Sequence, residues 1–404
     1  MAGLAGFLLL AFLIYQIPTV RYALEWRYEK YTVYLKNIID PIGPAPTPLP
    51  HTPLPPQAAN TPTATENVAT VTASTPTPTL PPLPAQVLLE SPKWEQQTPN
   101  NCGPATLSMA LHMYGWDGNQ GDIAKQIKPV IGDRNVNPEE LAYYVRNFAG
   151  WLNIQYRVNG HITLLKRLIA AHYPVIIEGT TKLDPNDALG ANDDLWAAHY
   201  LLITGYDDAA QTFTVQDSYH GADQTVSYSQ LEAEWEPFNY LYMFVYLPQE
   251  EEEIKSILGP DFDEEQNRRA ALEAAQNATT ANPNNAYAWF NLGSNLVYFE
   301  RYDEAAQAYD QARDIGLPLR MFRYQFGPFI AYFQSNRIDD LLALTNYAKG
   351  VTEMSEETWL WYGWALYRKN DFKGAVAAWN KAISINDSSY VDARRAIDFV
   401  NQNQ

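Results

Sequence analysis

The stretch QQTPNNCGPAT, residues 96–106, holds Cys102, which is the only cysteine among 404 residues. Apolar side chains follow it at helical spacing, at positions 107, 110, 111 and 114. The sequence therefore predicts a helix over 102–114 with Cys102 at its N-terminus, capped by Asn100 or Asn101. The partial positive charge at that end favours the thiolate and lowers the pKa of a cysteine from its free value near ~8.5.

A thiolate needs a histidine to protonate the leaving amine, a group to orient that histidine, and a donor for the oxyanion. His199 opens the apolar run HYLLITGYD, and Asp217 lies near the end of the run TFTVQDS. Turn residues between the two runs predict an antiparallel hairpin, in which His199 lies nearly opposite Asp217. Gln97 and Gln96 stand five and six residues before the thiol, and either amide could stabilise the oxyanion.

These segments, with DRNVNPEEL at 133–141, resemble papain-like peptidases of the C39-like family, which includes the double-glycine leader peptidases of bacteriocin exporters. The resemblance implies an α+β papain-like cysteine peptidase that hydrolyses a peptide or protein substrate. It implies the roles of nucleophile for Cys102, general acid/base for His199, orienting residue for Asp217 and oxyanion donor for Gln97, with Gln96 as the alternative donor. The exporters carry a transport ATPase, but no GxxxxGK phosphate loop occurs here, so transport-coupled leader removal is not implied.

Two other functions use the same residues. The acyl group could pass to an amine instead of water, which would make the protein a transamidase. A catalytically silent papain-like module could instead act with the rest of the chain as a scaffold for protein interactions. The sequence does not separate hydrolysis from transamidation.

Four short β-branched and aromatic runs predict strands at 174–179, 199–207, 212–218 and 240–248, so residues 87–249 are expected to form the peptidase domain. The glutamate run 250–253 and Gly259-Pro260 predict an acidic hinge over 250–264. The loop from Asp184 to Asp194 is interpreted as solvated, with calcium binding or selection of a basic substrate as the alternatives.

A repeat with aromatic and small residues follows the hinge. Members at 289, 292, 293, 305, 309 and 312 recur seventy residues later, which is two units of about 34–36 residues. The pattern resembles the tetratricopeptide repeat, so residues 265–404 are expected to form an all-α solenoid that binds a protein partner. The middle unit is degenerate, because Pro328 falls where a helix is expected.

The N-terminus carries an uncharged apolar stretch at residues 4–20, close to the ~20 residues that span a bilayer. We expect a transmembrane anchor over 1–22 and a juxtamembrane helix over 23–40, which makes the membrane a predicted partner. Residues 41–86 hold 14 of the 28 prolines and predict a disordered Pro/Thr-rich linker. Basic residues after the anchor favour a cytoplasmic flank, but such stalks are typical of the cell exterior, so we expect an extracytoplasmic catalytic domain.

The composition excludes some partners. A formal net charge of -18 argues against nucleic acid, because phosphate binding needs clustered Lys and Arg. No pair such as HExxH occurs, so we expect neither a metal nor another cofactor.

Overall fold

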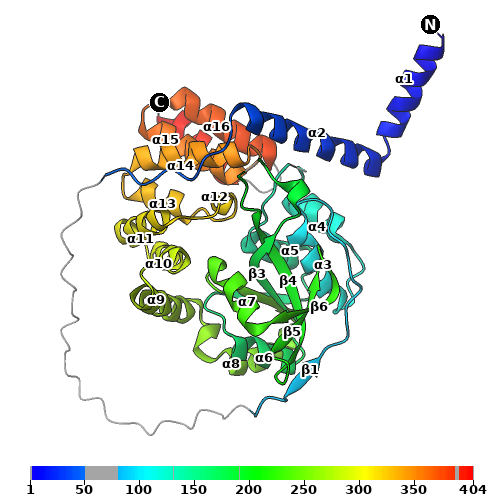
Figure 1. The fold of residues 1–404 in the computed structure, drawn as a ribbon, viewed down its shortest axis with the longest axis vertical. Helices are drawn as coiled ribbons and strands as arrows, with labels where there is room; N and C mark the ends of the chain where they lie inside the picture. The colour runs from blue at the N-terminus through cyan, green and yellow to red at the C-terminus, as the bar shows by residue number, and fades with distance from the viewer. Residues whose placement is uncertain (1, 51–80, 131, 191, 387–390, 404) are drawn as a thin grey trace.

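The computed structural model describes residues 2–50, 81–130, 132–190, 192–386 and 391–403. Figure 1 shows an N-terminal pair of helices, a sheet domain and an adjoining helical region. The N-terminal helices are α1 (Ala2–Tyr15) and α2 (Pro18–Ile39). The sheet domain contains β1 (Gln86–Leu88), α3 (Cys102–His112), α4 (Gln120–Ile127), α5 (Pro138–Phe148), β2 (Asn153–Arg157), α6 (Ile162–Ala170), β3 (Val175–Lys182), β4 (Trp196–Asp207), β5 (Thr212–Asp217), β6 (Gly221–Ser227), α7 (Tyr228–Trp235), β7 (Tyr242–Tyr246) and α8 (Glu251–Leu258). The helical region contains α9 (Glu264–Ala281), α10 (Ala286–Tyr298), α11 (Tyr302–Ile315), α12 (Met321–Tyr324), α13 (Gly327–Gln334), α14 (Ile338–Val351), α15 (Glu356–Arg368), α16 (Phe372–Ile385) and α17 (Val391–Asn403).

The sheet is antiparallel, in the order β2-β7-β3-β4-β5-β6, and β1 pairs with β4. The four predicted strands are present as β3, β4, β5 and β7. The sequence analysis missed β1, β2 and β6. β2 and β6 are the two edge strands in this order. Most of the polar side chains of β6 are exposed, so its sequence lacks the apolar run from which a strand is predicted.

Helices cover both faces of the sheet because side chains alternate along each strand. On one face, Ile176 and Leu202 pack with α3, α4 and α5. On the other face, Ile177 packs with α6, α7 and α8. Ile254 of α8 is fully buried in this second core, so most of the segment 250–264, predicted as a hinge, is helical and covers the sheet. Apolar residues at helical spacing behind the glutamates explain the difference.

The N-terminal apolar run does not form the expected membrane-spanning helix. None of the helices among the described residues is long and apolar enough to cross a bilayer. The run 4–20 is divided between α1 and α2, with Gln16 and Ile17 outside both helices and Pro18 at the start of the second. With 14 residues, α1 reaches about 21 Å, which is shorter than the ~30 Å hydrocarbon core.

The predicted linker 41–86 contacts the rest of the chain at both of its described ends. Its residues 51–80 lie outside the described part of the structure. At its far end, Tyr206 donates to the carbonyl of Pro84 at 2.8 Å, two residues before β1 begins. At its near end, Ala45 packs against the core of the helical region. A segment that buries no core of its own can therefore still be held by a backbone hydrogen bond at one end and by side-chain packing at the other.

The helical region pairs its helices as the repeat pattern predicts. α10 packs on α11, and α15 packs on α16. The recurring glycines allow this packing, because a Cβ at Gly293 would lie 2.7 Å from the Tyr309 ring, and one at Gly363 would lie 2.4 Å from the Trp379 ring. The degenerate unit is α13 and α14, in which α13 has only 8 residues and takes Pro328 into its first turn.

The loop from Asp184 to Asp194 joins the sheet domain to the helical region. Arg320, between α11 and α12, donates from Nη1 to Asp193 Oδ1 at 2.7 Å, and both side chains are only 1% exposed. The backbone N–H of Leu319 donates to Asp194 Oδ2 at 2.8 Å. The interpretation as a solvated loop is wrong for Asp193, because a guanidinium from a distant part of the chain replaces its water.

The sheet domain and the helical region also meet at a cluster of carboxyl groups. On α15, Glu357 Oε1 accepts from Asn137 Nδ2 at 2.7 Å. Burial, reinforced by the charges of Glu356 and Asp133, raises the pKa of Glu357 well above its ordinary value. Burial raises the pKa of Glu140 in the same way, with Glu357 as the next cause. These acids hold a proton in the native state at a pH where the unfolded chain has lost it, so their contribution to stability falls as the pH rises above about 4.3.

We expect Glu357→Gln to raise the thermal midpoint of unfolding by a few degrees at pH 8, because glutamine keeps the acceptor for Asn137 and carries no charge. The difference from the wild type should grow between pH 5 and pH 8. Calorimetry at the two pH values checks this, and a difference that shrinks with rising pH would contradict it.

Candidate active site

Cys102 is the first residue of α3, and its thiol is half-buried. The preceding Asn100 has a φ of 60°, in the left-handed region that asparagine tolerates, and its carbonyl accepts from Lys128 Nζ at 2.6 Å. Asn101 occupies the predicted cap position, but its side chain makes no cap bond and instead donates to Gln120 Oε1 at 3.0 Å. The helix N-terminus is therefore positioned by Lys128 and Gln120 rather than by an asparagine cap.

The hairpin of β4 and β5 brings His199 to Asp217, as the sequence predicts. Leu202 lies opposite Gln216 in the register, and His199 Nε2 is 2.8 Å from Asp217 Oδ1. The second oxygen, Oδ2, is 2.7 Å from Nδ1 of His220, whose side chain is 48% exposed. His220 thus shares the carboxylate and does not take the place of His199.

Cys102 and His199 line the same pocket, and each shifts the pKa of the other. Burial alone would lower the pKa of His199, but its hydrogen bond with Asp217 and its interaction with Cys102 raise that pKa to about 10. Burial would raise the pKa of the Asp217 carboxyl, but the bond with His199 holds it well below its usual range. Burial also acts to raise the pKa of the Cys102 thiol, but the interaction with His199 outweighs it, and the net pKa is lowered. The shifts of Cys102 and His199 both favour the thiolate–imidazolium pair over the neutral thiol and imidazole.

The sequence analysis missed two charged residues near the thiol. The Lys128 amine lowers the pKa of Cys102 further and also donates to the carbonyl of Asp133 at 2.7 Å. Glu178 on β3 lies opposite Tyr200, and burial raises its pKa well above the ordinary value, with the charges of Glu139 and Cys102 as further causes. A glutamate inside the apolar run VIIEG was a signal for a buried acid, because such a charge is costly. No pattern in the sequence around Lys128 indicated that its amine would lie near the thiol.

The two candidate oxyanion donors differ in how they are held. The Gln97 N–H donates to the carbonyl of Ser218 at 2.8 Å, and the Ser218 hydroxyl donates to Gln97 Oε1 at 2.9 Å. This bond fixes the Gln97 side chain and leaves its amide nitrogen free to donate. The Gln96 side chain is exposed, and its backbone carbonyl accepts from Gln120. Both glutamines line the same pocket as the thiol.

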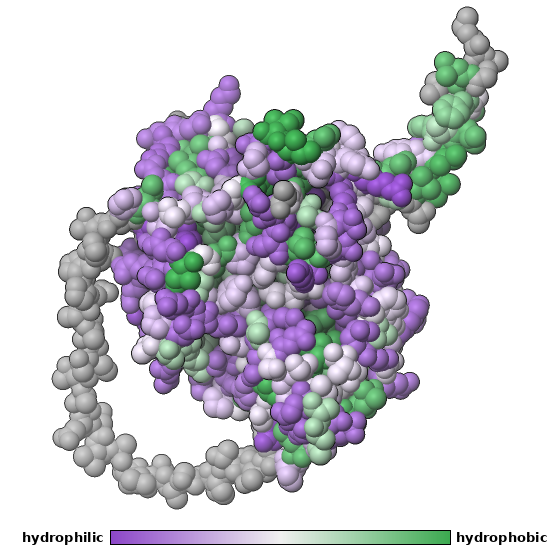
Figure 2. All heavy atoms as spheres, viewed as in Figure 1, coloured by the Kyte–Doolittle hydropathy of each residue, from purple (hydrophilic) through white to green (hydrophobic). Residues whose placement is uncertain are grey.

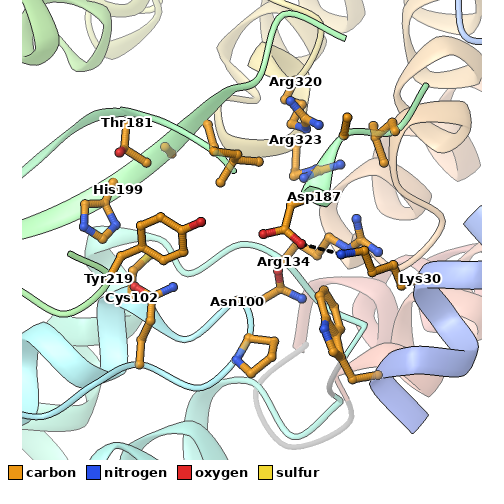
Figure 3. A pocket seen from close by; sticks show the side chains of 18 of the residues that line it. Lys30, Asn100, Cys102, Arg134, Thr181, Asp187, His199, Tyr219, Arg320 and Arg323 are labelled. Carbon is orange, nitrogen blue, oxygen red and sulfur yellow. Dashed lines mark hydrogen bonds and ion pairs between the residues drawn. The ribbon is translucent and has the colours of Figure 1, made fainter. Parts of the chain in front are cut away.

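Cys102 and His199 open onto a pocket of about 260 Å³. In Figure 3 they lie at one end of it, and Lys30 of α2 lies at the other end, where it pairs with Asp187 at 2.7 Å. Arg323 lines the pocket from the helical region, so three parts of the chain contribute to its walls. Within the described residues, no group of three or more His, Cys, Asp or Glu side chains is placed to hold a metal ion.

The fold and the site define a protein with a peptidase-like α/β domain followed by a helical repeat region. Residues 89–243 match the model of the Peptidase_C39 like family, and residues 258–317 match a tetratricopeptide repeat model. These two parts of the chain are therefore similar to the C39-like peptidase family and to the tetratricopeptide repeat, as the sequence resemblance implied.

Three solved structures are similar to parts of the chain. A protein described as a C39-like peptidase from Bacillus anthracis is 16% identical, with 40% of this chain and 97% of the other covered and a TM-score of 0.31. The MamA RS-1 ArsTM double mutant is 12% identical, with 34% and 75% covered and a TM-score of 0.30. The peptidase domain of Streptococcus ComA, a bi-functional ABC transporter involved in a quorum sensing pathway, is 15% identical, with 40% and 98% covered and a TM-score of 0.29. No curated protein matches the chain.

Proposed function

We propose that this protein is a cysteine peptidase that hydrolyses peptide bonds with Cys102, His199 and Asp217. The observation that carries the proposal is that Cys102 and His199 line the same pocket, while His199 Nε2 lies 2.8 Å from Asp217 Oδ1. A half-buried thiol with a lowered pKa beside a histidine with a raised pKa is the arrangement that nucleophilic catalysis needs. A thiol that served only to fill a core would not need this partner.

In this mechanism the Cys102 thiolate attacks the carbonyl carbon of the scissile bond. The His199 imidazolium then gives its proton to the amine nitrogen as the C–N bond breaks, which leaves a thioester on Cys102. Water attacks the thioester while the neutral His199 ring takes its proton, and the thiolate departs. The Asp217 carboxylate holds the ring through Nε2, so that the other ring nitrogen serves Cys102.

The Gln97 amide donates to the oxyanion in both tetrahedral intermediates. Its fixed oxygen supports this role, since a donor must be aligned before charge develops. We expect Gln97→Ala to lower kcat by about a hundredfold to a thousandfold, with little change in KM. Gln96→Ala is the matched control and should change kcat by only a few-fold. The reverse ranking in steady-state kinetics would assign the oxyanion to Gln96.

The substrate is a peptide or protein segment that enters the pocket between the sheet domain, α2 and the repeats. The repeats serve as the site for a protein partner and also form one wall of the pocket through Arg323. Their buried contact with the loop that carries Asp193 supports a role in shaping the cleft.

The proposed function is tested by exposing a complex peptide mixture to the wild-type chain and to Cys102→Ala. Mass spectrometry of new termini should show a set of cleavages that only the wild type makes. Identical terminus profiles would remove the peptidase proposal. Products that carry a new amide to an added amine, in place of a free acid, would identify a transamidase.

A further inference from the structure

The chain's own N-terminal segment is bound by the repeats. Beyond α2, the backbone carbonyl of Pro46 accepts from Arg313 Nε at 3.1 Å and also from Arg313 Nη2. Three residues later, the N–H of Leu49 donates to Asp340 Oδ1 at 3.0 Å. Ala45 packs against the apolar core of the repeats. In Figure 1 this segment follows α2 and runs along the repeats.

The sequence of the segment prescribes an extended conformation. In PAPTPLP, residues 44–50, every residue is a proline or directly precedes one. Proline fixes φ near about −65°, and the residue before a proline is pushed to the β or polyproline II region. A polyproline II helix has about 3 residues per turn, so Pro46 and Leu49 present their backbone groups on the same side. That spacing matches the two groups that the repeats contact.

The binding residues form a built site. The Arg313 and Asp340 side chains are each only 1% exposed and lie 3.4 Å apart. Arg313 Nη1 also donates to the Tyr332 hydroxyl at 2.8 Å, and that hydroxyl donates to Asp310 at 2.9 Å. The guanidinium and the carboxylate are therefore held in place on α11 and α14. The Arg313 guanidinium donates to a backbone carbonyl, and the Asp340 carboxylate accepts from a backbone N–H. Together they match a C=O and an N–H that lie one turn apart on the same strand.

We propose that the surface formed by α11, α13 and α14 is a receptor for proline-rich strands in the polyproline II conformation. The site binds a proline carbonyl and an N–H three residues later, and it needs a residue other than proline at that second position. Residues 44–50 occupy the site within the same chain. A proline-rich segment of a partner protein competes for it.

Occupancy of the receptor positions α2 over the catalytic pocket. Only Asp40 and a few residues separate the end of α2 from the bound strand. Lys30 of α2 pairs with Asp187 at the pocket, and the Trp26 ring lies 5.6 Å from the Arg134 guanidinium. Displacing the strand removes the anchor that keeps α2 there, so a bound partner widens access to Cys102. The consequence for catalysis rests on the proposed function, whereas strand binding does not.

The recognition is tested with labelled peptides of residues 41–50 and the full-length chain. The chain carries Leu49→Pro, which keeps the extended conformation of its own strand but removes the N–H that Asp340 accepts. One peptide is N-methylated at Leu49, and the matched control is N-methylated at Thr47, which also precedes a proline. Fluorescence anisotropy should show that the Leu49-methylated peptide binds between about tenfold and a hundredfold more weakly than the control. Equal affinities, or no binding of the unmodified peptide, would overturn the proposal.

Competition within the chain is tested by comparing the wild type with Leu49→Pro. The unmodified peptide should bind Leu49→Pro about tenfold more tightly, because the competing strand is weakened. Saturating peptide should also speed alkylation of Cys102 by a bulky maleimide several-fold in the wild type. Tight peptide binding with an unchanged alkylation rate would overturn the link to α2. Neither readout requires peptidase activity, so failure of the proposed function would be distinguishable.

Discussion

His199→Ala is expected to reduce alkylation of Cys102 by iodoacetamide about a hundredfold at pH 6.5. Without the imidazolium, the thiol pKa returns to at least its free value near ~8.5, and only about 1% of the thiol is ionised at pH 6.5. The same substitution should lower kcat for peptide cleavage on the order of 10⁵-fold or more, since the amine loses its proton donor. Intact-mass spectrometry measures the labelling without ambiguity, because Cys102 is the single cysteine.

His172→Asn is the matched control for this prediction. His172 is exposed, lies on the turn after α6 and has a φ of 67° that asparagine tolerates. The variant should alkylate at the wild-type rate. In the wild type, alkylation should remain fast well below pH 8, and cleavage should fall as the pH rises through about 10, where His199 loses its proton. An unchanged labelling rate in His199→Ala would show that the thiol is not activated by this ring.

Asp217→Ala is expected to lower kcat by about 10³-fold to 10⁴-fold. The buried His199 ring would lose the acceptor for Nε2 and the charge that raises its pKa. Asp217→Asn keeps an acceptor but no charge, so its loss should be smaller, about tenfold to a hundredfold. In Asp217→Asn the alkaline limit of the pH–rate profile should also move to lower pH, because the pKa of His199 falls with the loss of the carboxylate.

His220→Ala separates the two histidines that share this carboxylate. The His220 ring is half-exposed on Oδ2 of Asp217, so its removal should change kcat by only a few-fold. Steady-state kinetics over a pH range checks both variants. If His220→Ala lost activity and His199→Ala kept it, the general acid/base would be His220 and the role proposed for His199 would be wrong.

Local patterns predicted much of the fold. Helical spacing after Cys102 placed α3, and turn residues between two apolar runs predicted the β4–β5 hairpin that joins His199 to Asp217. The seventy-residue period identified the paired helices, because Gly293 and Gly363 recur at this spacing and each packs against an aromatic ring of the partner helix. The expected membrane-spanning helix is not found among the described residues, where the apolar run is interrupted before Pro18.

The sequence by itself determined the peptidase-like domain, the repeats and the candidate residues Cys102, His199 and Asp217, because each rests on spacing within a short stretch or on a hairpin with a nearby turn. Only the tertiary structure decided that Arg320 buries Asp193, that Lys128 holds the turn before the thiol, and that the repeats bind the chain's own proline-rich strand. Such contacts join residues as many as 291 positions apart. Sequence periodicity reports which face of a helix or strand is buried, but it does not say which distant residue a charged group or a carbonyl will contact. These pairs can therefore be identified only in the folded structure.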